Sequence, residues 1–147
     1  MTARLVISDA EYALAQVQGG AWVTIAVLAG GAEALVASHQ PVDERQLEAA
    51  IETAEDWLMP HASALRGEAL EVQDSAGRLR AGMEKVLSVT TSQWSLADVE
   101  SFFLKLVDTA TGRHPSPLLA GQHHFVADLL LLRELAHHGQ LARIHVV

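Results

Sequence analysis

The sequence predicts an α+β fold: an antiparallel sheet built from hairpins, with helices packed on one face and a helix-rich C-terminal third. Short runs of apolar and β-branched residues meet at glycines, as the strands of hairpins do. Longer stretches repeat apolar residues with the helical period of 3.6. The chain of 147 residues is 50% apolar and only 19% charged, which fits a single globular domain over residues 1–147.

The first part of the chain predicts a strand, a helix and a hairpin. RLVIS at residues 4–8 is short and apolar, as a strand would be. Residues 9–20 read as a helix that ends in a glycine pair, because glycine commonly follows the last helical turn. Apolar residues then run up to a second glycine pair and resume after it. This pattern predicts a hairpin with strands near 22–28 and 33–38.

A long amphipathic pattern follows at residues 43–60 and predicts a helix. Asp43 is a suitable N-cap, and Gln46 follows three residues later, the spacing of a capping box. Apolar residues recur along one face of this helix: Leu47, Ala50, Ile51, Ala54 and Leu58. Pro60 predicts where the helix ends.

The rest of the chain predicts a hairpin, two helices and a final strand. The elements are a hairpin around Gly77 with a further strand near 84–89, a helix from Ser95 to Gly112, a helix from about 117 to 138, and a strand within 141–147. Over roughly the first two-thirds of the chain, the order helix, hairpin, helix, strands resembles the topology of roadblock or profilin-like modules.

The charge of the chain argues against nucleic acid or a membrane as its partner. Ten basic residues stand against 18 acidic ones, a formal charge of −8, whereas nucleic-acid binding relies on basic residues that neutralise phosphates. The most apolar run, Ala21 to Ala32, is shorter than the roughly 20 residues of a spanning helix. The start of the chain lacks a signal-peptide pattern and cysteine is absent, so we expect a cytoplasmic protein.

Common catalytic motifs are missing from the sequence. It has no Gly-x-Ser-x-Gly, no Gly-x4-Gly-Lys-Ser/Thr, no Gly-x-Gly-x-x-Gly and no His-Glu-x-x-His. These absences argue against the usual hydrolase, nucleotide-driven and dinucleotide-dependent enzymes. A small enzyme that relies on histidine and carboxylate side chains is still compatible with the sequence.

Histidines gather near residues 118–140 and raise the question of a metal site. The better set for a divalent metal such as zinc is His114, His123, His124 and Asp128. The second set, further along the same predicted helix, is Glu134, His137 and His138. Glu134 and His137 have the Glu-x-x-His spacing that directs two side chains at one ion. In the competing interpretation both histidine pairs are simply helix ends, where they interact with exposed peptide groups, and no cofactor is bound.

Asp128 stands within an apolar run and needs a partner, because an unpaired buried charge is costly. His124, one helical turn earlier, is the predicted partner. A His–Asp pair is half of a general-base arrangement, although such pairs also occur for purely structural reasons.

Together these observations predict a small accessory or interaction protein, an assembly factor or adaptor without catalysis of its own. The high apolar content favours self-association as a homodimer, or a protein partner. The expected contact residues are Trp22, Trp57, Trp94, Glu48, Glu52 and Glu55. The alternative is a small metal-dependent or histidine-based enzyme, or a metal carrier, that uses the C-terminal histidine clusters.

Overall fold

The computed structural model describes residues 2–112 and 117–147. The strands are β1 (Ala3–Ile7), β2 (Glu11–Gln18), β3 (Ala21–Ala29), β4 (Ala69–Gln73), β5 (Gln93–Trp94) and β6 (Arg143–Val146). The α-helices are α1 (Ala32–Leu35), α2 (Glu44–Leu58), α3 (Ala62–Leu65), α4 (Arg78–Leu87), α5 (Leu96–Thr111) and α6 (His123–Gly139). Two short 3-10 helices are η1 (Met59–His61) and η2 (Pro117–Leu119).

The described strands form one sheet in the order β3-β2-β1-β4-β6-β5. β1, β2 and β3 are joined by antiparallel pairing, as a meander of hairpins. β4 pairs in parallel with β1 on one side and with β6 on the other. The sheet is therefore mixed, and its parallel part requires long helical connections between the strands.

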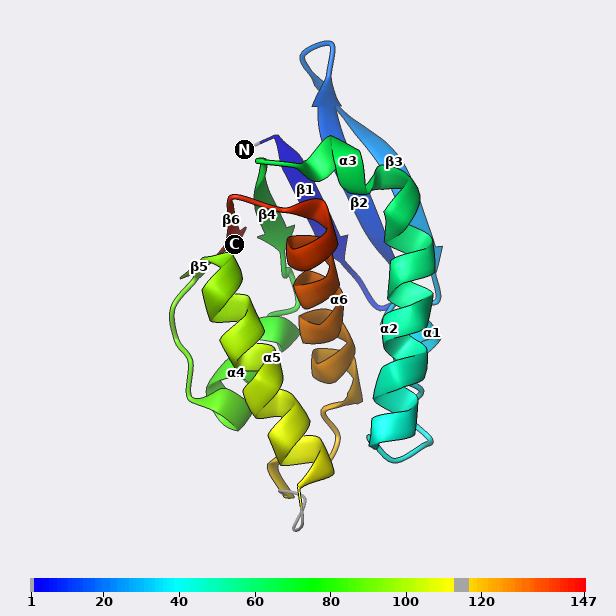
Figure 1. The fold of residues 1–147 in the computed structure, drawn as a ribbon, viewed down its shortest axis with the longest axis vertical. Helices are drawn as coiled ribbons and strands as arrows, with labels where there is room; N and C mark the ends of the chain where they lie inside the picture. Colours follow the sequence, from blue (N-terminus) through cyan, green and yellow to red (C-terminus); the bar gives the residue numbers. More distant parts are fainter. Residues whose placement is uncertain (1, 113–116) are drawn as a thin grey trace.

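The helices form a layer on one face of this sheet, with α6 between α2 and α5 (Figure 1). Along β1, fully buried side chains alternate with partly exposed ones, so one face of the strand belongs to the core. The middle of α6 is buried on most sides, because Leu129, Leu130, Leu131 and Leu132 are all inaccessible to solvent. The α+β class, with helices packed on the sheet, is confirmed. The sheet departs from the prediction in its parallel pairs and in some of the segments that form its strands.

Several local predictions near the N-terminus were wrong because glycine pairs were misread. Residues 11–18 form a strand, and Gly19 and Gly20 both have positive φ angles, as in a tight two-residue hairpin turn. The buried Tyr12 and Leu14 alternate with partly exposed neighbours, which fits a strand period of two. The chain thus begins with three consecutive strands, so the element order of a roadblock or profilin-like module is not observed.

Two other glycines begin helices instead of joining strands. Gly31, with φ +56°, precedes α1, so residues 33–35 of the strand predicted at 33–38 are helical and residues 36–38 form no strand. Gly77, with φ +74°, is the N-cap of α4, which replaces the second half of the predicted hairpin and the strand near 84–89. Glycine readily adopts a positive φ both in a hairpin turn and at the start of a helix, so its presence alone does not distinguish the two structures.

The helices α2 and α5 and the first and last strands were predicted correctly, whereas α6 was predicted to begin near residue 117 but begins at His123. The carboxylate of Asp43 accepts a hydrogen bond from the backbone of Gln46 at 2.8 Å and caps α2. Ser95 and Asp98 form a reciprocal capping box at the start of α5. Among the described helices, none is long and apolar enough to cross a membrane.

Candidate functional site

A cavity lined by both apolar and charged side chains lies where the carboxyl ends of β1 and β4 meet. The two strands are adjacent and parallel, and Val6 pairs with Gln73 at this edge of the sheet. The cavity has a volume of about 260 Å³, and its lining is Val6, Ile7, Ser8, Asp9, Asp74, Ser75, Ala76 and Arg78. Ligands of open α/β sheets commonly bind at the carboxyl ends of parallel strands, which makes this strand-end cavity the first place to seek a function.

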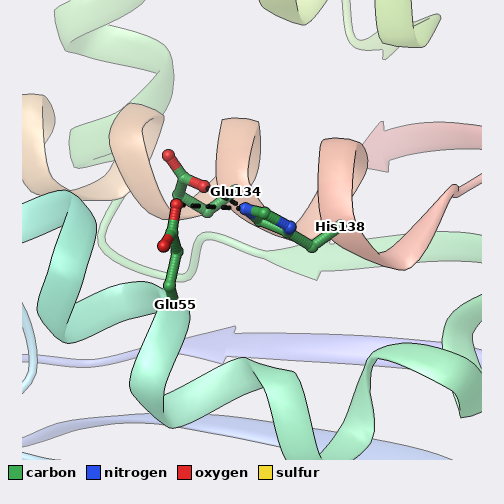
Figure 2. Close-up of side chains that lie close together, drawn as sticks. All are labelled: Glu55, Glu134 and His138. Carbon is green, nitrogen blue, oxygen red and sulfur yellow. Dashed lines mark hydrogen bonds and ion pairs between the residues drawn. The ribbon is translucent and has the colours of Figure 1, made fainter.

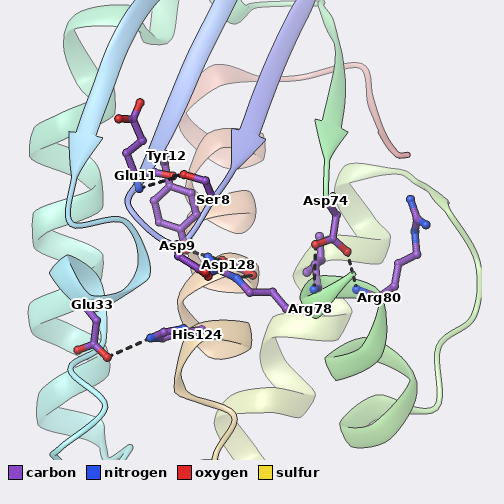
Figure 3. A network of polar contacts seen from close by, with 11 residues as sticks. Ser8, Asp9, Glu11, Tyr12, Glu33, Asp74, Arg78, Arg80, His124 and Asp128 are labelled. Carbon is purple, nitrogen blue, oxygen red and sulfur yellow. Dashed lines mark hydrogen bonds and ion pairs between the residues drawn. The ribbon is translucent and has the colours of Figure 1, made fainter. Parts of the chain in front are cut away.

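The loop that follows β4 is held by Asp74. This nearly buried carboxylate accepts hydrogen bonds from the backbone amides of Leu79 at 3.3 Å and Arg80 at 3.0 Å (Figure 3). It therefore satisfies amide groups that the first turn of α4 leaves without helical partners. These hydrogen bonds fix the loop. Arg78, the first residue of α4, is therefore held at a defined position beside the cavity.

Arg78 is held in turn by Asp128 of α6. Its Nε donates to Oδ2 and its Nη2 to Oδ1 of Asp128, both at 2.8 Å. The hydroxyl of Tyr12 on β2 donates to the same Oδ1 at 2.5 Å. Tyr12, Asp128 and Arg78 thus connect the sheet, α6 and α4 in one buried network, drawn in Figure 3. A bidentate pair of this kind restricts the orientation of the guanidinium group.

Burial and charge change the acidity of this network. Burial raises the pKa of the Asp128 carboxyl group above its usual value, and the hydrogen bonds from Arg78 oppose that change. Burial also raises the pKa of Tyr12 well above its usual value, and the charge of Asp128 adds to the effect. Burial works to lower the pKa of Arg78, but its hydrogen bonds with Asp128 and the charge of that carboxylate outweigh it and raise the pKa. Tyr12 therefore remains a hydrogen-bond donor and Arg78 remains a cation.

The remaining terminal nitrogen of Arg78, Nη1, forms no hydrogen bond with Asp128 and lies near Asp9, another residue of the cavity lining. This nitrogen lies 3.5 Å from a carboxylate oxygen of Asp9, and the side chain of Asp9 is 95% exposed. A fixed cation and an accessible carboxylate therefore lie side by side at the strand-end cavity. Such a pair can bind an oxyanion through the guanidinium and position a water molecule or a hard cation through the carboxylate.

The first predicted histidine cluster does not come together in the described residues. Nε2 of His123 lies 2.6 Å from the carbonyl oxygen of Gln40, whereas Nε2 of His124 lies 3.0 Å from a carboxylate oxygen of Glu33. His124 is therefore not the partner of Asp128, whose carboxylate is engaged by Arg78 and Tyr12. His114, the fourth predicted ligand, lies outside the described residues.

The second predicted cluster forms in part. Nε2 of His138 lies 3.1 Å from Oε2 of Glu134, one turn earlier on α6. The third member is Glu55 of α2 rather than the predicted His137, which is exposed at the end of α6. The sequence analysis named Glu55 only as an expected contact residue, because nothing in the spacing along the chain indicates that α2 packs beside α6.

The predicted contact residues are scattered over the molecule. Trp94 is only 3% exposed and donates its ring N–H to the carbonyl oxygen of Thr91, so it has little surface to offer a partner. Trp57 is partly buried against the core, and Trp22 is the most accessible of the three at 37%. Glu48 and Glu52 are exposed on α2.

Residues of the strand-end cavity were missed by the sequence analysis. One signal was present: polar residues directly follow an apolar strand at Ser8–Asp9 and again at Asp74–Ser75. The parallel pairing that brings these two segments together joins residues far apart in the chain, and no local pattern announces it. The segment after residue 73 was also assigned to a hairpin, which would have carried Arg78 away from the cavity.

No model of a known protein family matches the chain, and no curated protein matches its sequence. Solved structures nevertheless share its fold, an open mixed sheet covered by helices. The structure of the PPX-GPPA enzyme of Aquifex aeolicus matches with a TM-score of 0.68 at 10% identity, over 98% of this chain and 52% of that one. An exopolyphosphatase of Cytophaga hutchinsonii matches with a TM-score of 0.65 at 14% identity, over 98% and 52%. An exopolyphosphatase-like protein matches with a TM-score of 0.59 at 8% identity, over 98% and 53%.

This likeness corrects the prediction of a non-catalytic accessory or adaptor protein. The structures that share the fold are described as enzymes, namely phosphatases and exopolyphosphatases, and not as interaction modules. At such low identity the likeness shows a shared fold. The chain spans about half the length of these solved structures.

Proposed function

We propose that the chain is a phosphatase-type domain that binds phosphoryl groups at the strand-end cavity and takes part in their hydrolysis. The observation that carries this proposal is the placement of Asp9 and Arg78 at the carboxyl ends of the parallel strands β1 and β4. The fold it shares with phosphatases and exopolyphosphatases supports the same reaction class. The substrate class is a phosphoanhydride or phosphate ester.

Each side chain has a role that follows from its surroundings. Nη1 of Arg78 is the part of the guanidinium that Asp128 leaves free, and it donates to a phosphoryl oxygen. The exposed carboxylate of Asp9 orients the attacking water, directly or through a bound hard cation. The water oxygen bonds to phosphorus and releases a proton, the bond from phosphorus to the leaving oxygen breaks, and the leaving oxygen takes up a proton. Tyr12 and Asp128 act indirectly, by positioning Arg78.

The experiment measures phosphate release from inorganic polyphosphate by the purified chain in the presence of Mg²⁺. Because related structures are about twice as long, binding is measured alongside, as the rise in melting temperature that polyphosphate causes. Asp9→Asn should lower phosphate release by about a hundredfold, the usual scale for loss of a group that handles water. Arg78→Lys keeps a charge but loses the bidentate contact, so it should weaken both binding and release.

Arg66→Gln and Glu48→Gln are the matched controls. Arg66 is exposed ahead of the amino end of β4, at the opposite edge of the sheet, and Glu48 is exposed on α2. Both variants should behave like the native chain. The proposal fails if polyphosphate neither stabilises the chain nor releases phosphate, or if Asp9→Asn and Arg78→Lys match the controls.

The cellular location of the chain and its self-association are predicted from the sequence. We expect a cytoplasmic protein and a homodimer, in keeping with the high apolar content of a small chain. Three valines and a tryptophan are exposed on or beside the β2–β3 hairpin: Val17, Trp22, Val23 and Val27. Sedimentation at micromolar concentration tests the dimer, and a monomer would remove that part of the proposal.

A further inference from the structure

A compact group of metal-type side chains joins α2 to the end of α6. Nε2 of His138 lies 3.2 Å from Oε1 of Glu55 and 3.1 Å from Oε2 of Glu134. Figure 2 shows both carboxylates turned toward the same ring nitrogen. The three side chains can each offer one ligand atom, and all these atoms lie within 4.8 Å of one another.

One carboxylate oxygen of this group is buried and has no hydrogen-bond donor among the described residues. Glu134 is completely buried, and its Oε1 accepts a hydrogen bond from Nη1 of Arg133 at 2.9 Å. Its Oε2 is also buried but accepts no hydrogen bond in the structure. Nε2 of His138 is near, but its hydrogen bond is with Oε1 of Glu55. A buried carboxylate oxygen without a donor is costly, and a cation beside it removes that cost.

The spacing of the three atoms suits a small divalent ion. Zinc binds histidine nitrogen and carboxylate oxygen at about 2.0–2.2 Å, so two ligands of a tetrahedral site lie roughly 3.3 Å apart. The two nitrogen–oxygen separations of 3.1 and 3.2 Å are close to that value. One imidazole and two carboxylates form a set of three protein ligands, which leaves a fourth position for water.

The surroundings allow an ion to enter and be held. The side chains of His138 and Glu55 are partly exposed, whereas Glu134 forms the buried base of the group. Arg133 holds the second oxygen of Glu134 and so orients the carboxylate, as outer partners of metal ligands commonly do. His138 is ten residues beyond Asp128 on α6, or about 15 Å along the helix axis. The group is therefore distinct from the strand-end cavity.

We propose that Glu55, Glu134 and His138 form a binding site for one divalent transition-metal ion, with zinc the best fit. Nitrogen and oxygen donors in this ratio suit zinc better than the softer metals that need thiolates. By joining α2 to α6, the ion stabilises the packing of the helical layer. The proposal does not depend on phosphatase activity and is tested without a substrate.

The test begins with protein stripped of metal by a chelator and then titrated with Zn²⁺. Calorimetry should show one tightly bound zinc per chain, and saturating zinc should raise the melting temperature by roughly 5 °C or more. Co²⁺ in place of zinc should give the visible absorption of a tetrahedral site. Glu55→Gln and His138→Gln each remove one ligand and should weaken zinc binding at least tenfold, with loss of most of the thermal shift. Glu134→Gln is expected to have the same effect.

Two neighbouring variants separate this site from general binding by surface side chains. His137→Gln removes the adjacent exposed histidine, and Glu52→Gln removes an exposed carboxylate one turn earlier on α2. Both should bind zinc like the native chain. The proposal is overturned if the native chain binds no zinc. It is also overturned if Glu55→Gln, which changes a partly exposed residue and should fold, binds zinc as tightly as Glu52→Gln does.

Discussion

Arg78 and Asp128 meet as a bidentate ion pair, with both nitrogen–oxygen distances at 2.8 Å. Arg78 begins α4 beside the strand-end cavity, whereas Asp128 lies in the middle of α6 and is completely buried. The pair therefore links the candidate site to the core. The same contact that stabilises the buried carboxylate also fixes the cation that faces the cavity.

Replacing Arg78 by methionine should destabilise the fold strongly. The variant leaves the Asp128 carboxylate buried without its cation, and loss of one partner from a buried pair typically costs about 3–5 kcal/mol. Urea denaturation measures the free energy of unfolding. Arg80→Met removes an exposed arginine two residues away and should change stability by no more than about 0.5 kcal/mol. Equal effects of the two variants would show that the pair is not important for stability.

Replacing Tyr12 by phenylalanine should have a smaller effect. The substitution keeps the buried ring but removes the hydroxyl that donates to Oδ1 of Asp128, while both hydrogen bonds from Arg78 remain. Loss of one donor to a buried acceptor costs about 1–3 kcal/mol. In a double-mutant cycle with Asp128→Asn, we expect a clear interaction energy between the two positions. Strict additivity would contradict the network described above.

Replacing Gly82 by alanine should destabilise the contact between α4 and α6. A β-carbon at this position would lie 2.2 Å from Cγ of Phe125, whose ring is buried and cannot move aside freely. Overpacking of this kind costs about 1–3 kcal/mol, which outweighs the gain in helix propensity. Thermal unfolding measures the loss. The double variant with Phe125→Leu should recover part of it, and a stable single variant would mean that the two helices are less tightly packed than the structure indicates.

The stability of the fold should depend on the ionisation of Glu33. Hydrogen bonds from Ser38 and His124 lower the pKa of Glu33 to about 2. A carboxyl group with a lowered pKa in the folded state stabilises the protein above its unfolded-state pKa, and this stabilisation is lost as the pH falls through the folded-state pKa. Glu33→Gln should therefore be less stable than the native chain at about pH 5, and the difference should disappear as the pH approaches about 2.

Urea midpoints measured across this pH range test the prediction. Glu48→Gln, which removes an exposed carboxylate on α2, serves as the control and should show little pH-dependent difference. A constant difference between Glu33→Gln and the native chain at every pH would mean that the ionisation of Glu33 makes no contribution.

Local signals in the sequence predicted the three long helices α2, α5 and α6, but not the shorter α1 and α4. The N-caps at Asp43 and Ser95 and the apolar repeats behind them depend only on neighbours within a few residues, so they were readable without any structure. The first and last strands were predicted for the same reason, since alternation with a period of two is visible in a short segment. Glycine pairs were ambiguous, because a positive φ serves a hairpin turn and a helix terminus equally well.

Only the tertiary structure decided which distant side chains meet. The parallel pairing of β1 with β4 creates the strand-end cavity and joins segments separated by more than 60 residues. Arg78, not the nearby His124, is the cationic partner of Asp128, because the packing of α4 on α6 brings it within reach across 50 residues of sequence. Glu55 meets Glu134 and His138 because α2 packs beside α6. The sequence by itself determined the long helices and the first and last strands, since their signals are local. Long-range packing decided the contacts on which the candidate sites depend. The spacing of residues along the chain does not predict such contacts, because they join segments that are distant in the sequence.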